Sequence, residues 1–487
     1  MVAGTVADRR LRMSERARFA HRQVKVRGHL YWDLLTLWQG MLSGLRAAAS
    51  FGPVASVAVD SWGVDYALVD ERGELLNMPA HYQDGRAAAA MTRLTGLCDL
   101  EDLYRRNGTA LDPTLTLVQL LAEPSERLER ARHLLMLADL FGFWLTGVAG
   151  SEISLASTTG LLGLGGTRWD VQLAQTLGIP PRLLAPLRRA GEPAGLLDST
   201  VAAEVGLDGG VPVRVAAAHD TASAVAAVPC DSRTPFAFIS VGTWSLVGVE
   251  LEHPVLSGEA RTAGFTNELG VQGTVRFLRK VTGLRLLTEC VRGWEAQGSP
   301  VDLEVLLAGA EGLPAGQWIV DPDDESLEGP GDMPHRIGAL CRRDGRPDPL
   351  NAMEVVRCVV DSLALAHRRA VRDAVALTGR DVSVVHLVGG GSQNPLLGQA
   401  TADACAVEVV AGPPEATSAG NILVQAGAAG ALSPDLESLR SCVRRSVRLR
   451  RFQPRDTALW DAIDDGFGTR ERVASAPATM TGDDRVN

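Results

Sequence analysis

The strongest constraint on the fold is the way in which helical and strand-like apolar patterns alternate along the last third of the chain. Apolar residues recur at helical spacing over residues 352–378, and a short apolar run follows at 382–388. Three glycines at 389–391 then lead to a second helical stretch at 395–405 and another apolar run at 407–410. This alternation predicts an α/β protein with mixed sheets.

Two strand-turn-strand units are expected upstream of this region. In the first, apolar runs at 54–59 and 64–69 flank the turn Asp60-Ser61-Trp62-Gly63, which predicts a hairpin. In the second, runs at 236–240 and 245–251 flank residues 241–244, as at the start of a new domain. The other expected elements are helices at 94–104, 115–122, 125–145 and 221–228, a strand at 211–217, and loops across 309–350.

The length and the break in pattern after Pro229 predict the domain organisation. A chain of 487 residues has room for about three average domains or for two large α/β domains. We expect an N-terminal domain at 1–230 and a C-terminal domain at 231–465. The residues from 469 onward are polar and aperiodic, which predicts a disordered tail over 469–487.

Charge and cysteine usage narrow the function classes. The formal charge is −10, so the chain lacks the general attraction to phosphate backbones on which nucleic-acid binders rely. Its seven cysteines are scattered singly, which disfavours zinc and redox sites and favours reduced thiols, with a Cys341–Cys358 bridge left open. No apolar stretch is long enough to span a membrane. We therefore expect a cytoplasmic protein that acts on small molecules.

Lysine is almost absent, which excludes one kind of nucleotide site. Lys25 and Lys280 are the two lysines of the sequence, and neither follows a glycine. A P-loop needs a Gly-Lys pair that places an ammonium group at the β- and γ-phosphates. P-loop chemistry is therefore excluded, and a Schiff-base lysine is disfavoured.

Asp220 is the first candidate for chemistry. It leaves an apolar strand and enters a helix, and ligands of α/β sheets bind beyond the carboxyl ends of strands. A carboxylate at this place could accept a proton from a substrate hydroxyl. It could also be a helix N-cap, and the local sequence alone favours the cap.

Three turns are candidates for ligand contacts. Gly389-Gly390-Gly391-Ser392 joins a strand to a helix, and Gly242-Thr243 joins two strands, so both could offer backbone amides to phosphate. Asp60 and Asp65 flank Trp62-Gly63 and could bind sugar hydroxyls. Each of these segments is also explained by ordinary turn and core packing without any ligand.

Taken in order, these segments resemble a known family. The residues concerned are Val59-Asp60-Ser61-Trp62-Gly63-Val64-Asp65, Ala218-His219-Asp220-Thr221-Ala222-Ser223-Ala224-Val225, Gly242-Thr243-Trp244-Ser245-Leu246 and Val388-Gly389-Gly390-Gly391-Ser392-Gln393-Asn394, supported by Thr266-Asn267-Glu268. Together they resemble the FGGY carbohydrate kinases, and within that family the members that act on L-rhamnulose. The likeness runs from near residue 2 to about residue 460.

The resemblance implies a fold, a reaction and a set of site residues. The fold would be α/β, with two actin-like (ribonuclease H-like) domains and a central active cleft. The reaction would transfer the ATP γ-phosphate to the 1-hydroxyl of L-rhamnulose, with Mg²⁺ bridging the phosphates and no protein residue assigned to the metal. The residues implied are Asp220 as catalytic base, Gly63, His219 and Thr221 as sugar contacts, and Thr243 and Gly391 as nucleotide contacts.

The sequence also departs from this family. Each family domain opens with a strand, a phosphate-binding turn and a second strand, and Met1-Val2-Ala3-Gly4-Thr5-Val6 matches only the second strand of the N-terminal copy. We therefore expect the native protein to carry the missing segment upstream of Met1. Lys280, Arg285 and Thr288 replace the family's usual asparagine, tryptophan and glutamine, the first of which contacts sugar and the last nucleotide.

These departures leave two alternatives open. One is a kinase for another ketose, such as L-fuculose or L-xylulose, since an ammonium in place of an amide at Lys280 changes both charge and hydrogen-bond direction. The other is a catalytically silent relative that binds sugar. The oligomeric state is not predicted.

Overall fold

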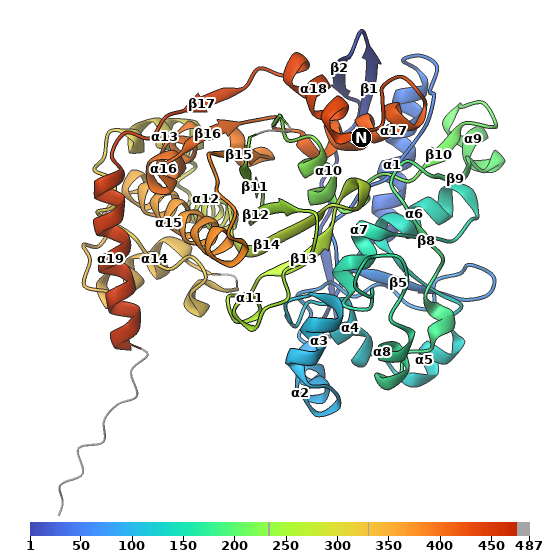
Figure 1. Ribbon diagram of the computed structural model, residues 1–487, viewed down its shortest axis with the longest axis horizontal. Helices are drawn as coiled ribbons and strands as arrows, with labels where there is room; N and C mark the ends of the chain where they lie inside the picture. The colour runs from blue at the N-terminus through green and yellow to red at the C-terminus, as the bar shows by residue number, and fades with distance from the viewer. Residues whose placement is uncertain (232–233, 330, 475–487) are drawn as a thin grey trace, which may run out of the picture. The chain divides into compact units, whose positions relative to one another are not determined.

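The computed structural model of the chain describes residues 1–231, 234–329 and 331–474 (Figure 1). Contacts within the chain group it into two compact units. Among the described residues, the first contains Met1–Lys280, Ala370–Gln393 and Val410–Arg451, and the second contains Val281–Arg369, Asn394–Val409 and the chain from Phe452 to Ala474. The expected boundary between family domains near residue 230 falls inside the first unit and stays a prediction.

The largest sheet among the described residues has seven strands in the order β13-β14-β12-β11-β15-β16-β17. β11 and β12 form an antiparallel hairpin in which Val241 lies opposite Ser245, which confirms the second expected strand-turn-strand unit. β15 runs parallel to β11 on its other side, with Val388 beside Ser240, so both strands end at the same edge of the sheet. The strands are β11 (Phe236–Val241), β12 (Trp244–Leu251), β13 (Thr266–Leu269), β14 (Val275–Thr282), β15 (Val384–Val388), β16 (Glu408–Ala411) and β17 (Arg450–Phe452).

Two helices pack closely beside this edge. α10 (Asp220–Ala226) and α17 (Ala416–Ala428) contact each other along their lengths. Gly420 permits the approach, because a Cβ atom there would lie 1.8 Å from the carbonyl oxygen of Ser223. Apolar residues of α10 share a buried cluster with Phe238 of β11 and Val388 of β15. The C-terminal half of α10 is thereby packed on the sheet that carries both glycine turns.

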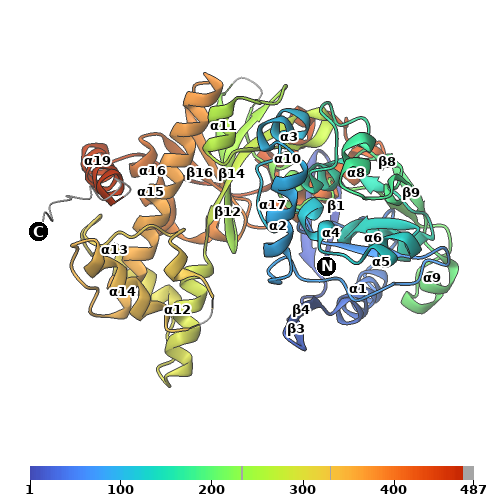
Figure 2. The same ribbon diagram turned by 90° about the horizontal axis from the view of Figure 1, so that it is seen from below.

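The N-terminal part of the first unit is built from hairpins and short helices. β1 and β2 form a hairpin that lies against α17 and α18 (Figure 1), and the β3–β4 hairpin projects beside α1 (Figure 2). The strands are β1 (Val2–Ala7), β2 (Arg10–Glu15), β3 (Gln23–Val26), β4 (His29–Trp32), β5 (Tyr66–Val69), β6 (His133–Met136), β7 (Ser151–Glu152), β8 (Leu187–Arg188), β9 (Pro193–Leu196) and β10 (Pro212–Arg214). The helices are α1 (Leu34–Ala49), α2 (Ala87–Leu97), α3 (Leu100–Asn107), α4 (Thr116–Leu121), α5 (Ser125–Arg130), α6 (Leu137–Thr146), α7 (Ile153–Ala156), α8 (Val171–Thr176), α9 (Ser199–Val205), α11 (Gly258–Thr262) and α18 (Leu436–Ser446).

The first expected hairpin is wrong. The segment 54–59 lies parallel to the segment before α10, with Val57 bridged to Val213, and β5 pairs antiparallel with β6. Residues 65–69 are buried, whereas in 54–59 only Val57 is buried, and each segment pairs with a distant partner rather than with its neighbour in sequence. Val64, with φ at 65°, turns the chain between them.

Two helix expectations and one loop expectation also need correction. The stretch 94–104 is split between α2 and α3, because Asp99 accepts a hydrogen bond from the Asp102 amide and starts a new helix. The stretch 125–145 is interrupted by β6, whose buried residues pair with β5. The region 309–350 contains α14 (Met333–Arg343), which Asp332 caps.

The second unit is mostly helical, and here the expectations fit better. α15 (Ala352–Thr378) and α16 (Pro395–Cys405) have the expected bounds. Arg368 of α15 pairs with Asp461 and Asp464 of α19. The other helices are α12 (Arg285–Ala296), α13 (Leu303–Glu311) and α19 (Thr457–Ala474). The expected tail is wrong over 469–474, where good helix formers extend α19, and its remainder lies outside the described residues.

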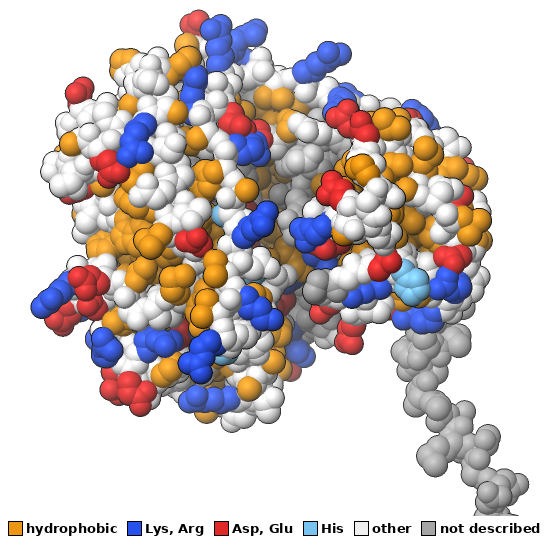
Figure 3. Space-filling model, turned by 180° about the vertical axis from the view of Figure 1, so that it is seen from behind, with side chains coloured by type: hydrophobic (Ala, Val, Ile, Leu, Met, Phe, Trp, Pro, Cys, Tyr) orange, Lys and Arg blue, Asp and Glu red, His pale blue; other side chains and the backbone are white. Residues whose placement is uncertain are grey.

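Two further expectations can be compared with the structure. Cys341 and Cys358 lie with their sulfur atoms 4.0 Å apart and are not bonded to each other. In the described residues no helix is both long and apolar enough to cross a membrane. The face shown in Figure 3 has acidic and basic side chains interspersed with apolar ones, so its described part carries no continuous basic surface.

Candidate active site

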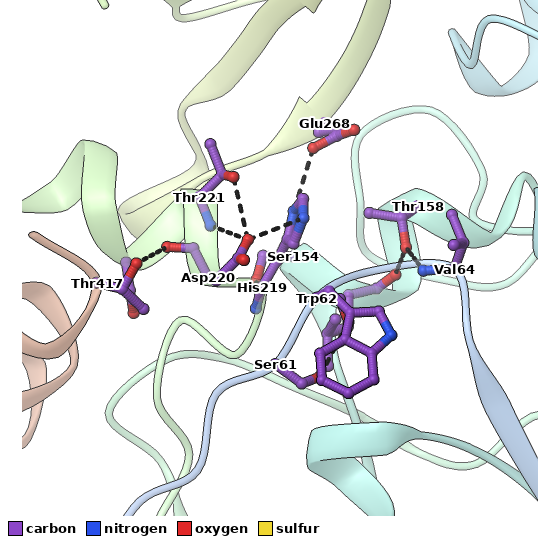
Figure 4. Close-up of polar contacts among 12 residues, drawn as sticks. Ser61, Trp62, Val64, Ser154, Thr158, His219, Asp220, Thr221, Glu268 and Thr417 are labelled. Carbon is purple, nitrogen blue, oxygen red and sulfur yellow. Dashed lines mark hydrogen bonds and ion pairs between the residues drawn. The ribbon is translucent and has the colours of Figure 1, made fainter. Parts of the chain in front are cut away.

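Backbone hydrogen bonds bring two separate segments together at the start of α10. The Ser61 amide donates to the Ala218 carbonyl at 2.8 Å, and the Asp220 amide donates to the Ser61 carbonyl at 2.9 Å. The turn that contains Trp62 and Gly63 therefore lies beside the start of α10, which carries Asp220 (Figure 4). The strand expected at 211–217 is shorter, since β10 ends at Arg214.

The Asp220 carboxylate is accessible and held on one side. Its side chain is 44% exposed. Its Oδ1 atom accepts from the Thr221 amide at 2.5 Å and from the Thr221 hydroxyl at 3.1 Å, while the Asp220 carbonyl accepts from Thr417 of α17 at 3.1 Å. The N-cap position of α10 is occupied by His219, so Asp220 is a helical residue and not the cap that the local sequence favoured. The carboxylate is thus placed to accept a proton from a bound hydroxyl.

His219 lies behind this carboxylate, with 6% of its surface exposed. Its Nε2 atom is 3.4 Å from Asp220 Oδ1. Its Nδ1 atom is 3.1 Å from Arg276 Nη2 and 3.2 Å from Glu268 Oε2. Figure 4 shows Asp220, His219 and Glu268 as consecutive members of one polar chain. Both ring nitrogens therefore face protein groups.

Gly63 lies at a close approach, since a Cβ atom there would be 3.0 Å from the Thr158 side chain. Nearby Asp65 has no exposed surface, and it accepts from the indoles of Trp32 at 2.7 Å and Trp62 at 2.8 Å. Burial raises the pKa of Asp65 to about 6, although these hydrogen bonds lower it. Asp65 therefore orients tryptophans in the core and is not available to a sugar.

Asp60 adds a second carboxylate next to the base. Asn421 of α17 donates to Asp60 at 2.5 Å. Burial raises the pKa of Asp60 to about 6 in spite of this hydrogen bond, and the negative charge of Asp220 raises it further. Of the two aspartates that flank Trp62-Gly63, Asp60 is the one that interacts with the candidate base.

The two glycine turns meet at Val241. A Cβ atom on Gly391 would lie 2.3 Å from Val241 Cγ1, and one on Gly389 would lie 2.9 Å from the Val241 carbonyl oxygen. Thr243 follows in the β11–β12 turn and is exposed. The structure thus brings the two proposed nucleotide contacts, Thr243 and Gly391, to one edge of the sheet.

The three residues that depart from the family have different surroundings. Lys280 pairs with Asp112 at 2.7 Å, and its ammonium group lies 4.9 Å from the centre of the Trp244 ring. Arg285 and Thr288 belong to α12, where Arg285 donates to the Leu327 carbonyl at 3.1 Å and Thr288 to the Leu284 carbonyl at 3.1 Å. Lys280 is thus fixed beside the turn that contains Thr243.

The sequence reasoning missed the contribution of Glu268 and Arg276. These residues are opposite each other in the β13–β14 ladder, and Arg276 Nη1 is 3.1 Å from Glu268 Oε2. The signal was two opposite charges inside apolar strands, since buried charges are normally paired. No group of three or more His, Cys, Asp or Glu side chains that could hold a metal ion is found in the described parts of the chain.

Comparisons with known proteins identify the family. The description "FGGY family of carbohydrate kinases" fits residues 10–227 for its N-terminal domain and residues 237–429 for its C-terminal domain. A rhamnulokinase of Bacteroides thetaiotaomicron is 36% identical over 465 residues, covering 95% of this chain and 94% of its own. A rhamnulokinase of Pectobacterium carotovorum is 38% identical over 453 residues, covering 92% and 89%.

Solved structures show the same fold at lower identity. A xylulose kinase from Lactobacillus acidophilus with bound ligand gives a TM-score of 0.78 at 15% identity, covering 98% of this chain and 96% of its own. A Plasmodium falciparum glycerol kinase with ADP gives a TM-score of 0.75 at 15% identity, covering 94% and 93%. The fold expected from the sequence is confirmed. With both halves of one family matched along nearly the whole sequence, the chain belongs to the FGGY family of carbohydrate kinases.

Proposed function

We propose that this carbohydrate kinase transfers the γ-phosphate of ATP to the 1-hydroxyl of L-rhamnulose and yields L-rhamnulose 1-phosphate and ADP. The substrate is inferred from the relatives named rhamnulokinase, which are similar over more than nine-tenths of this chain. The observation that carries the chemistry is the half-exposed Asp220 carboxylate beside the Trp62-Gly63 turn. The reaction is proposed for the cytoplasm, where ATP is available.

In the proposed reaction Asp220 acts as general base. Its Oδ1 atom is engaged by Thr221, so Oδ2 is the atom proposed to take the hydroxyl proton. The sugar oxygen then forms a bond to the γ-phosphorus while the bond from that phosphorus to the ADP oxygen breaks. Gly63 and Thr221 are proposed to line the sugar site with His219, whose ring nitrogens are turned toward protein groups.

Mg²⁺ is proposed to enter as part of the nucleotide substrate. Mg²⁺ keeps several waters and is commonly held by substrate phosphates with one or two carboxylates. This is consistent with the described residues, which include the carboxylates of Asp60 and Asp220 but no group of three His, Cys, Asp or Glu side chains that could hold a metal ion. The amides and hydroxyl of the Thr243 and Gly391 turns are proposed to hold the phosphates.

One observation supports a different ketose as the substrate. Lys280 is held by Asp112 and by the Trp244 ring, where family members have an asparagine that contacts sugar. An ion pair donates and accepts hydrogen bonds differently from an amide. Another ketose, such as L-fuculose or L-xylulose, is therefore the alternative substrate.

ADP release from the native protein with a panel of ketoses tests the proposal. We expect the highest kcat/KM with L-rhamnulose, no release without sugar, and a product with phosphate at the 1-position by phosphorus NMR. A higher kcat/KM with L-fuculose or L-xylulose would replace the substrate assignment. ADP release that does not depend on any sugar, or no release with any sugar, would contradict the kinase reaction.

A further inference from the structure

The charged groups around His219 determine which of its ring nitrogens can carry a proton. Asp220 faces Nε2, and Glu268 and Arg276 both face Nδ1. The His219 backbone amide is also fixed, because it donates to the Ser154 hydroxyl at 3.1 Å. The ring therefore lies between an acceptor on one side and an acceptor and a donor on the other.

At Nδ1, Arg276 and Glu268 favour opposite protonation states, and Arg276 decides between them. A guanidinium only donates hydrogen bonds, so an Arg276 Nη2 atom 3.1 Å from Nδ1 requires an unprotonated nitrogen there. A neutral imidazole then carries its proton on Nε2, which lies 3.4 Å from the acceptor Asp220 Oδ1. A proton on Nδ1 would instead oppose the Arg276 N–H and leave the Nε2 lone pair facing the carboxylate.

Glu268 and a carbonyl keep the guanidinium in this place. Arg276 has no exposed surface, and its Nη1 atom lies 3.1 Å from Glu268 Oε2. Its Nη2 and Nε atoms also donate to the Leu269 carbonyl at 3.0 and 3.2 Å. Although burial opposes it, Arg276 and then His219 hold the pKa of Glu268 below its ordinary value. The carboxylate thus stays charged and holds the guanidinium through this ion pair, while the Leu269 carbonyl holds it through hydrogen bonds.

We propose that Arg276 and Glu268 are positioning residues that hold His219 as the Nε2–H tautomer, so that the ring donates to Asp220 Oδ1. With the two donors of Thr221, this gives Oδ1 three donors and leaves Oδ2 as the atom that receives the substrate proton. The inference rests on the proposed function only for what Asp220 does with that proton. The tautomer itself is a property of the folded chain.

The wild-type protein tests the tautomer directly. Labelling histidine with ¹⁵N and recording long-range ¹H–¹⁵N correlations distinguishes a protonated from an unprotonated ring nitrogen. The chain has nine histidines, and His219→Gln identifies the signal by its loss. We expect the proton on Nε2 at neutral pH. A proton on Nδ1, or on both nitrogens, would overturn the proposal, and this measurement needs no variant that disturbs the core.

Variants test the part played by Arg276. Arg276→Met leaves Glu268 as the group that faces Nδ1, so the proton should move to Nδ1, while Arg276→Lys keeps a donor and should keep the wild-type signal. The matched control is Arg279→Met on the same strand, which removes an ion pair with Asp373 and should leave the His219 signal unchanged. An unchanged tautomer in a folded Arg276→Met protein would refute the role of Arg276.

Kinetics separate positioning from mere structural support. Arg276→Met should lower kcat by about 10-fold with a much smaller change in KM for the sugar, and Arg276→Lys should restore most of it. Equal loss in the Lys and Met variants would contradict a donor role. If the wild-type tautomer is as expected but no ketose is phosphorylated, the proposed function fails while the inference about His219 stands.

Discussion

Asp220→Asn separates the chemical role of the carboxylate from its structural role. The amide oxygen can still accept from the Thr221 amide, the Thr221 hydroxyl and His219 Nε2, so the first turn of α10 keeps its contacts. Weakening such hydrogen bonds by removing the charge costs about 1 kcal/mol of folding free energy. The substitution removes the atom that takes the proton, because an amide is not a general base at neutral pH.

The expected loss is therefore in turnover. Loss of general-base assistance lowers kcat by about 10² to 10⁴, which equals about 2.7 to 5.5 kcal/mol in the activation free energy. KM for the sugar should change much less than kcat, because the substitution alters one contact, that of Oδ2 with the reacting hydroxyl, and leaves the other proposed sugar contacts in place. Coupled ADP release gives kcat and KM, and urea unfolding gives the stability.

Asp198→Asn is the matched control. Asp198 caps α9 by accepting from the Thr200 amide at 2.9 Å, and asparagine caps about as well as aspartate. It should change neither turnover nor stability appreciably. If Asp220→Asn keeps kcat within about 3-fold of the wild type, the proton does not go to Asp220 and the assignment of the base is wrong.

Three further predictions concern packing and charge. Gly420→Ala should lower the free energy of unfolding in urea by about 1 to 3 kcal/mol, because its Cβ atom would meet the Ser223 carbonyl. The control is Gly96→Ala in α2, whose Cβ atom would meet nothing within 4 Å and which should raise the free energy of unfolding by about 0.5 to 1 kcal/mol. Similar effects of the two substitutions would contradict the packing argument. Since burial raises the pKa of Asp65 from 3.8 to about 6, the folded chain holds a proton that the unfolded chain lacks between these values. The contribution of Asp65 to unfolding free energy should fall as pH rises from 4 to 6, by at most about 3 kcal/mol, and Asp65→Asn should remove this fall. Lys280→Met should alter Trp244 fluorescence, and it should change the ratio of the KM values for different ketoses more than it changes kcat. The same KM ratio in the variant and the wild type would argue against a place for Lys280 in the sugar site.

The elements that could be predicted from sequence are those whose signal is local. α15 and α16 were expected with their observed bounds, because helical periodicity is written in the residues of the helix itself. The β11–β12 hairpin was expected because its turn is short and its strands are adjacent. The same reasoning failed for residues 54–69, where β5 pairs with β6 more than sixty residues away along the chain. An apolar run shows that it will be buried and does not show against which partner.

The residues of the candidate site also divide into those with a local sequence signal and those without one. Asp220, Gly63, Thr243 and Gly391 could be singled out because each follows a strand end or a turn that has a local pattern. The pairing of Glu268 and Arg276 with His219 could not, since it depends on the register of β13 with β14 and on the approach of that ladder to α10. Local sequence also favoured Asp220 as a cap, and only the position of His219 at the start of the helix removes that interpretation.

The proposed base and the residue proposed to set sugar preference are held by different contacts. The Ser61 amide donates to the Ala218 carbonyl and the Ser61 carbonyl accepts from the Asp220 amide, so backbone atoms alone join the Trp62-Gly63 turn to the proposed base. The donors to Asp220 Oδ1 come from Thr221 and His219, on the chain beside it, and none comes from Lys280 or Trp62. If Lys280 lies in the sugar site, as proposed, its substitution should change sugar preference without moving the carboxylate. Sugar preference and proton abstraction should consequently respond to different mutations, the first through KM and the second through kcat.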